Sequence, residues 1–181
     1  MTNYLHMRVL IAEDDLDVAS SYLKALGKSN HEVVISSDGE DCLNTYRSNI
    51  EKVAKVSNNH SAPSSSTFDA VILDYRMPKK DGIEVAKEIL ELNPNQRIIF
   101  ASAYVKETLE DAVKELKRVV ELMQKPFDAD ALVDTIEDKE VYENLKDLMK
   151  SVRKIREAQP TQKQIKDLFE SLKKIQKGRT F

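Results

Sequence analysis

Five short apolar runs along the chain alternate with stretches in which apolar residues recur every three or four positions. The runs are VLIA at 9–12, VVI at 33–35, AVIL at 70–73, IIFA at 98–101 and VVELM at 119–123. Continuous apolar runs of this length are typical of strands in a parallel sheet that is covered on both faces. The spacing between them predicts helices around 18–26, 43–53, 83–90 and 109–116, and a fifth from near Phe127. This alternation predicts an α/β fold with a parallel sheet and right-handed crossovers.

One segment interrupts the alternation. SNNHSAPSSST at 57–67 is polar, contains Pro63 and has no periodicity. We expect a flexible surface loop between the second helix and the third strand. A tolerated insertion without a function of its own is favoured there over a binding role, because lengthening a surface loop costs little free energy.

The C-terminal part, residues 139–181, has a different pattern and is expected to be a two-helix extension of a domain at 1–138. Its apolar residues form two narrow seams, separated by Gln159-Pro160, that suit helix–helix packing. Two helices of this size bury too little surface to fold alone, so they should pack on the domain, on a second copy in a homodimer, or on a partner. The seams consist of Val141, Leu145, Leu148, Val152 and Ile155, and of Ile165, Leu168, Leu172 and Ile175.

Charge separates the same two parts. The net charge is −3, but residues 1–145 carry 17 Lys and Arg against 27 Asp and Glu, whereas residues 146–181 carry 11 against 4. A solvated basic face that docks on the acidic domain, or that packs in a dimer, explains the basic tail. DNA binding is an alternative that we do not favour, because the tail lacks a convincing helix-turn-helix pattern.

Several classes of protein and site are excluded by composition. No apolar run approaches the roughly 20 residues that span a bilayer, and the N-terminus lacks the order of a signal peptide, so we expect a soluble, cytoplasmic protein without membrane contact. Cys42 is the only cysteine, which excludes an internal disulfide and a thiolate metal cluster. His6, His31 and His60 are too scattered to predict a histidine metal site.

Charged and hydroxyl residues follow four of the apolar runs. Carboxylates at 13–15 follow the first run, Asp74 the third, Ser102 the fourth and Lys125 the fifth. The carboxyl ends of parallel strands lie at one edge of a sheet, where ligands bind in open α/β folds. Carboxylates that meet there repel one another unless a cation neutralises them, and Mg²⁺ is the expected cation.

A carboxylate in such a place can act as a nucleophile that accepts a phosphoryl group. In this interpretation Asp74 attacks, and Mg²⁺ held by Asp14 and Asp74 bridges to the phosphoryl oxygens. Lys125 supplies a second positive charge, and Ser102 donates a hydrogen bond to the transferred group.

The motifs VLIAEDD, VILDYRMPKKDG, IIFASAY and QKPF, in this order and spacing, resemble the CheY-like receiver domain of two-component response regulators over roughly residues 7–138. The resemblance implies a doubly wound, flavodoxin-like, five-stranded parallel sheet in the order 2-1-3-4-5, followed here by a helical extension. It implies phosphorylation by a sensor histidine kinase or a phosphotransfer protein, and a signalling role instead of an enzymatic one. The output is then a switch in oligomerisation or partner binding through the tail, with a phosphorelay shuttle as a further alternative.

The resemblance also assigns roles to individual residues. Asp74 corresponds to the phosphoacceptor, Ser102 to the switch hydroxyl and Lys125 to the phosphate-binding lysine, with a cis bond before Pro126. Metal ligands are implied at Glu13, Asp14, Asp74 and the backbone carbonyl of Arg76. Asp14 with Asp15 remains open as the alternative acidic pair.

Two positions affect how the family's switch would operate in this chain. Receiver domains often carry Tyr or Phe three residues before the lysine, where this chain has Leu122, so the aromatic half of the usual switch is missing. Arg76 and Tyr104 flank the position from which water would attack the phosphoryl group. Their bulk leads to the hypothesis of slow self-dephosphorylation.

Overall fold

The computed structural model describes residues 6–56, 68–103, 116, 118 and 120–157. The chain forms two compact units, Met1–Glu137 and Asp138–Phe181, which we describe separately. Among the described residues, no helix combines the length and the apolar character needed to span a membrane. The predicted loop at 57–67, nearly all of the predicted helix at 109–116 and the second seam of the tail lie outside the described residues.

The first unit is built on one sheet of five parallel strands in the order β2-β1-β3-β4-β5, which confirms the predicted fold class. Each strand coincides with one of the apolar runs, although the last begins two residues later than its run and extends one residue further. The strands are β1 (Arg8–Ala12), β2 (Glu32–Ser36), β3 (Ala70–Asp74), β4 (Ile98–Ser102) and β5 (Glu121–Gln124).

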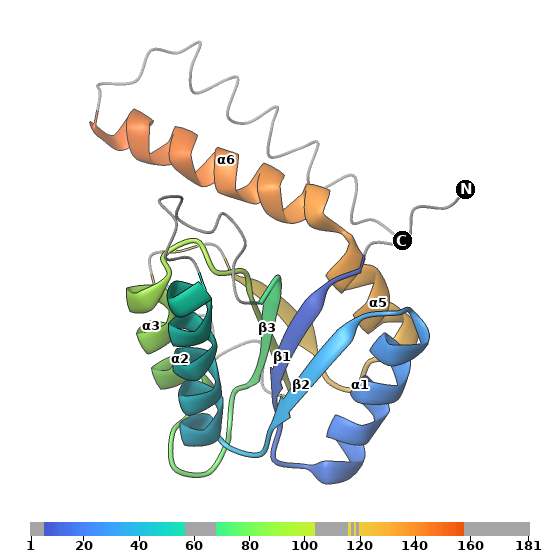
Figure 1. Ribbon diagram of the computed structural model, residues 1–181. Helices are drawn as coiled ribbons and strands as arrows, with labels where there is room; N and C mark the ends of the chain where they lie inside the picture. The colour runs from blue at the N-terminus through green and yellow to red at the C-terminus, as the bar shows by residue number, and fades with distance from the viewer. Residues whose placement is uncertain (1–5, 57–67, 104–115, 117, 119, 158–181) are drawn as a thin grey trace. The chain divides into compact units, whose positions relative to one another are not determined.

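Helices cover both faces of this sheet (Figure 1). One apolar cluster joins α2 and α3 to one face, and a second joins α1 and α5 to the other. Successive strand residues point to opposite faces, so Leu10 belongs to the first cluster and Ile11 to the second. Burial on both faces is why the strands read as continuous apolar runs. These helices are α1 (Leu16–Lys28), α2 (Gly39–Val56), α3 (Gly82–Leu92) and α5 (Ala129–Glu137).

Aspartates begin two of these helices. The Asp15 carboxylate accepts hydrogen bonds from the amides of Asp17 and Val18, at 2.9 and 3.1 Å, and so caps α1. At α3, Asp81 accepts from the Glu84 amide while the Glu84 side chain accepts from the Asp81 amide, which is a capping box. Asp81-Gly82 therefore has a structural role at the start of α3.

The described part of the second unit is α6 (Lys139–Glu157), which confirms a helix over the first seam. Its start is capped by Asp138, whose carboxylate accepts a hydrogen bond from the Val141 amide at 3.1 Å. Tyr142 is buried, and the Lys146 ammonium lies 5.2 Å from the centre of its ring. The seam residue Leu145 is half-buried.

Candidate functional site

The carboxyl ends of β1 and β3 lie side by side at one edge of the sheet, at the lower edge of Figure 1. Ala12 pairs with Leu73, so the residues that follow them, Glu13 and Asp74, occupy adjacent positions. Ala12 and Leu73 both belong to the cluster under α2 and α3. Because side chains alternate along a strand, Glu13 and Asp74 are aimed toward the α1 and α5 side.

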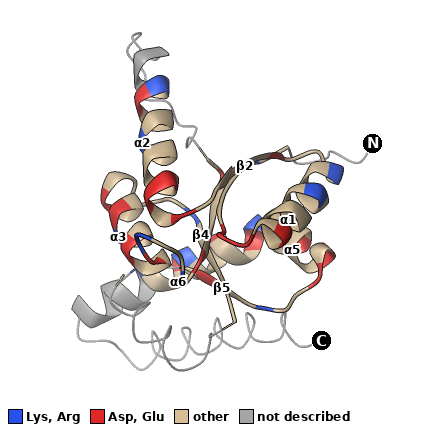
Figure 2. Cartoon of the chain, turned by 90° about the horizontal axis from the view of Figure 1, so that it is seen from below, with Lys and Arg blue, Asp and Glu red and all other residues tan. Residues whose placement is uncertain are grey.

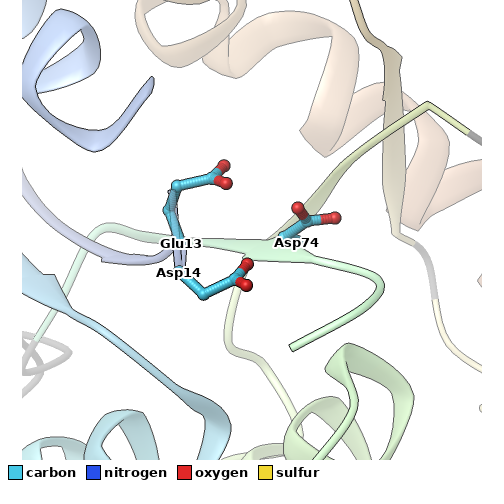
Figure 3. Close-up of side chains that lie close together, drawn as sticks. All are labelled: Glu13, Asp14 and Asp74. Atoms are coloured by element: carbon cyan, nitrogen blue, oxygen red, sulfur yellow. The ribbon is translucent and has the colours of Figure 1, made fainter. Parts of the chain in front are cut away.

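Three carboxylates meet at this edge. Glu13, Asp14 and Asp74 each offer one oxygen atom, and these oxygens lie within 4.8 Å of one another. Figure 3 shows the three side chains close together, and Figure 2 views the same edge with acidic residues in red. Glu13 is buried, Asp74 is partly buried and Asp14 is exposed. We name these three residues the acidic cluster.

Lys125 directly follows β5, and its side chain extends into the acidic cluster. Its ammonium donates hydrogen bonds to Glu13 Oε2 at 2.6 Å and to Asp74 Oδ2 at 2.9 Å. Its backbone amide donates to the Ser102 carbonyl at 2.9 Å, which ties the residue to the end of β4. The Lys125-Pro126 bond is cis, as the resemblance implied. The backbone hydrogen bond to Ser102 thus helps to hold one cation against two carboxylates.

The site carries more negative than positive charge, and its charged groups are partly shielded from water. Burial raises the pKa of Glu13, and the opposing hydrogen bond from Lys125 does not cancel this effect. Burial by itself lowers the pKa of Lys125, but hydrogen bonds to Glu13 and Asp74 raise it overall. Lys125 is therefore a permanent cation, whereas Glu13 holds a proton more readily than a carboxyl group in water.

Ser102 and Arg76 flank Asp74. Asp74 pairs with Ala101, so Ser102 lies one residue further along β4, where it is buried. The Arg76 amide donates to Asp74 Oδ1 over a long 3.4 Å, so the chain turns back toward the carboxylate directly after β3. Tyr104 lies outside the described residues.

The alternative acidic pair is distinguished by what its members do. Glu13 and Asp14 lie in the acidic cluster with Asp74, whereas Asp15 caps α1. Leu122, in place of the aromatic residue expected in the family, pairs with Phe100 across β4 and β5 and is 39% exposed.

One neighbour of the site was not anticipated as such. Tyr22 lies within the predicted helix at 18–26, and its ring stacks on Phe127, two residues after Lys125, with 5.4 Å between ring centres. Burial and the charges of Glu13 and Asp74 raise the pKa of its hydroxyl. A tyrosine at an apolar helix position gives no signal of this kind in a sequence, because the contact depends on where α1 lies against the loop after β5.

Comparison with known proteins gives one family. The Response regulator receiver domain matches residues 9–137. The response regulator receiver protein CpdR of Brucella abortus is 27% identical over 130 residues, which cover 72% of this chain and 93% of CpdR. The transcriptional regulatory protein ZraR of Salmonella typhimurium is 32% identical over 130 residues, 71% of this chain but only 25% of ZraR.

Solved structures agree on the fold. The chemotaxis protein CheY4 of Vibrio cholerae superimposes with a TM-score of 0.59 at 19% identity, over 74% of this chain and 98% of CheY4. The family match ends at residue 137, the last residue of the first compact unit, and does not include α6.

Proposed function

The chain belongs to the response regulator receiver domain family of two-component signalling, and on that premise we propose that it is switched by phosphorylation of Asp74. The observation that carries this proposal is the contact of Lys125 with both Asp74 and Glu13, beside a third carboxylate on Asp14. A partly exposed strand-end carboxylate that already lies against a cation can receive a phosphoryl group whose negative charge needs neutralising.

The acidic cluster fits a divalent cation. Its donors are carboxylate oxygens, the hard ligands that Mg²⁺ prefers, and they lie close enough together to share one ion. Glu13, Asp14, Asp74 and the Arg76 backbone carbonyl would hold it. When bound, Mg²⁺ neutralises the carboxylates and the incoming phosphoryl oxygens.

The residues of the chain divide the remaining work. An Asp74 oxygen attacks the phosphorus atom of a phosphohistidine on a histidine kinase or phosphotransfer protein. The new P–O bond forms as the P–N bond breaks, and the electron pair of that bond returns to the histidine nitrogen. Lys125 stays hydrogen-bonded at the acceptor, and the Ser102 hydroxyl donates to a transferred oxygen. In this proposal the chain is the acceptor of a signal and not an enzyme.

The tail is assigned the output. Residues 146–181 are basic, α6 carries one apolar seam and the sequence contains a second. Phosphorylation of Asp74 is proposed to change the self-association or partner binding of these helices. DNA binding by the basic tail is the second candidate, and the excess of Lys and Arg in residues 146–181 is the observation behind it.

Phosphoryl labelling tests the site. The full chain, incubated with Mg²⁺ and an acyl phosphate such as acetyl phosphate, is expected to gain the mass of one phosphoryl group by intact-protein mass spectrometry. Asp74→Asn should abolish the gain. Asp15→Asn is the matched control, since it removes a neighbouring carboxylate while asparagine still caps α1. Equal labelling of the Asp74→Asn variant would exclude Asp74 as the acceptor.

Light scattering tests the output. The molar mass of the full chain is measured with and without beryllofluoride plus Mg²⁺, which mimics the phosphoryl group. A mass shift that Asp74→Ala abolishes supports assembly driven by phosphorylation. No shift, together with retention on duplex DNA, would favour the second candidate.

A further inference from the structure

The loop between β3 and α3, residues 75–81, carries Arg76 and is held at its far end by the start of α2. The Lys79 ammonium donates a hydrogen bond to Asp38 Oδ2 at 2.8 Å, joining residues 41 positions apart in the chain. Asp38 is only 8% exposed. In Figure 1 the start of α2 and this loop both lie at the lower edge, where the strands have their carboxyl ends.

Asp38 is itself fixed to α2. Its Oδ1 accepts a hydrogen bond from the Asp41 amide at 2.9 Å, and its carbonyl accepts from the Cys42 amide at 3.0 Å. These bonds satisfy amides of the first helical turn, as a helix cap does. One carboxylate thus caps α2 with one oxygen and holds Lys79 with the other.

The backbone of the loop touches the same helix start. A Cβ atom on Gly39 would lie 2.2 Å from the Lys80 carbonyl oxygen, so only glycine fits there. Lys79 has a φ of 67°, in the left-handed region of backbone conformation that residues other than glycine and asparagine rarely adopt. The conformation persists because the surrounding contacts determine it. We name Asp38, Gly39, Lys79 and Lys80 the loop anchor.

The near end of the loop is tied to the acceptor. The Gly82 amide donates to the Tyr75 carbonyl at 2.9 Å. A Cβ on Gly82 would lie 2.2 Å from the Asp74 carbonyl oxygen. The two ends of the loop are therefore held together beside β3, and Lys79 and Lys80 attach it to the start of α2. Arg76 lies between these two attachments.

From this geometry we infer that Asp38 and Lys79 are positioning residues of the phosphorylation site, because their ion pair fixes the loop that presents the Arg76 carbonyl to Mg²⁺. The inference rests on the proposed function. Mg²⁺ requires near-octahedral geometry with short bonds, at about 2.0–2.1 Å, so a ligand on a loosened loop binds it less well. Partners that orient metal ligands typically contribute about 10- to 100-fold in affinity.

Lys79→Met separates positioning from electrostatics, because only the loss of positioning weakens Mg²⁺ binding. Removing a positive charge from the protein would by itself leave Mg²⁺ binding unchanged or make it stronger. Loss of the loop anchor instead predicts binding about tenfold weaker in calorimetric titration of the unphosphorylated full chain with Mg²⁺. Lys79→Arg, which keeps the ion pair, should restore affinity to within about twofold, and the exposed Lys52→Met in α2 is the control for loss of charge.

Asp38→Asn provides a second, independent variant. Asparagine still caps α2, but the negative charge that pairs with Lys79 is removed. The double variant with Lys79→Met should bind Mg²⁺ no more weakly than Lys79→Met alone, because both changes break one interaction. Circular dichroism confirms that each variant is folded. Phosphoryl labelling of Asp74 should become slower while its final extent is unchanged.

The outcomes separate this inference from the function on which it rests. If the unaltered chain neither binds Mg²⁺ nor is labelled on Asp74, the proposed function fails. If it does both and Lys79→Met binds Mg²⁺ as tightly or more tightly, the loop anchor has no positioning role. Fully additive losses in the double variant would likewise overturn it.

Discussion

The sheet carries an ion-paired cluster at each end, and the two differ in how completely their charges are balanced. At the amino end, Arg97 precedes β4 and Glu121 begins β5. Arg97 Nε donates to Glu121 Oε2 at 2.7 Å and Nη2 donates to Oε1 at 3.0 Å. The same guanidinium donates to the carbonyls of Ile136 and Thr135, at 2.8 and 2.6 Å, and so also holds the end of α5.

At the carboxyl end, the described residues combine the one ammonium of Lys125 with the three carboxylates of the acidic cluster. Both clusters withdraw charge from water. The Arg97–Glu121 pair matches one positive charge with one negative charge and uses its remaining donors on carbonyls. The acidic cluster keeps a formal excess of two negative charges when all three carboxylates are ionised, and an added cation can neutralise this excess.

The difference teaches where to look for function in this fold. A matched, hydrogen-bonded pair fixes the elements that it joins, is costly to break on one side only, and leaves no unbalanced charge to bind a ligand. An unmatched cluster lowers the stability of the unliganded protein and returns that free energy when a cation arrives. The amino end is accordingly expected to respond to mutation through stability, and the carboxyl end through binding.

The largest expected effect is at the matched pair. Arg97→Met leaves Glu121 buried without its partner, so the free energy of unfolding should fall by about 3–5 kcal/mol in urea denaturation. Removing both charges with Arg97→Met and Glu121→Leu should recover most of that loss. If the single change costs less than about 1 kcal/mol, the pair does not hold β4, β5 and α5 together.

We expect Mg²⁺ to stabilise the protein only through the acidic cluster at the carboxyl ends of the strands. At 10 to 100 times its dissociation constant, Mg²⁺ is expected to raise the free energy of unfolding by about 1.4–2.7 kcal/mol. Asp14→Asn should lose most of this gain, whereas the double change at Arg97 and Glu121 should keep it. Equal gains in all three proteins would show that the ion binds elsewhere.

Glu13→Gln sharpens the contrast through pH. Because burial raises the pKa of Glu13 above 4.5, the native state binds this proton more readily than the unfolded state. The contribution of Glu13 to stability is therefore full below pH 4.5 and is lost as the pH rises through the native pKa. Without Mg²⁺, the unaltered chain should lose stability relative to Glu13→Gln as the pH rises from 4.5 through the raised native pKa of Glu13. A constant difference between the two proteins over that range would contradict this assignment.

The smallest effect is expected at Asp38, where the pH dependence of stability has the opposite sign to that at Glu13. The hydrogen bond from Lys79 lowers the pKa of Asp38 below 3.8, so its contribution to stability is present above that value and is lost as the pH falls through the native pKa. Thermal denaturation should therefore show a small advantage over Asp38→Asn at neutral pH that disappears in acid. An advantage that grows in acid would be inconsistent with the pair.

Much of the fold could be predicted because it depends on local pattern. Strands buried on both faces must be apolar throughout, as at residues 70–73, and helices covering them must carry an apolar stripe. The candidate site could also be predicted from the sequence, because parallel strands bring their carboxyl ends to one edge of the sheet. Glu13, Asp74 and Lys125 could be grouped on that argument alone.

Other contacts could not be predicted, since they depend on distances between separate elements. Arg97 and Glu121 lie 24 residues apart in the sequence. In the sequence, Arg97 resembles any arginine before a strand, and Glu121 an acidic residue within an apolar run. Asp38 and Lys79 resemble ordinary loop residues in the same way. Their pairings become visible only when strand register and helix position are known.

The sequence by itself determined the order of elements, the edge of the sheet that holds the chemistry and the residue types available there. Hydrophobic periodicity and strand polarity depend on residues near one another in the chain, so they can be read directly. Only the tertiary structure decided which carboxylate caps α1 and which joins the acidic cluster, and that Lys125 bridges Glu13 and Asp74. Those choices depend on differences of an ångström or two between elements far apart in the chain, a scale on which hydrogen bonds form or fail.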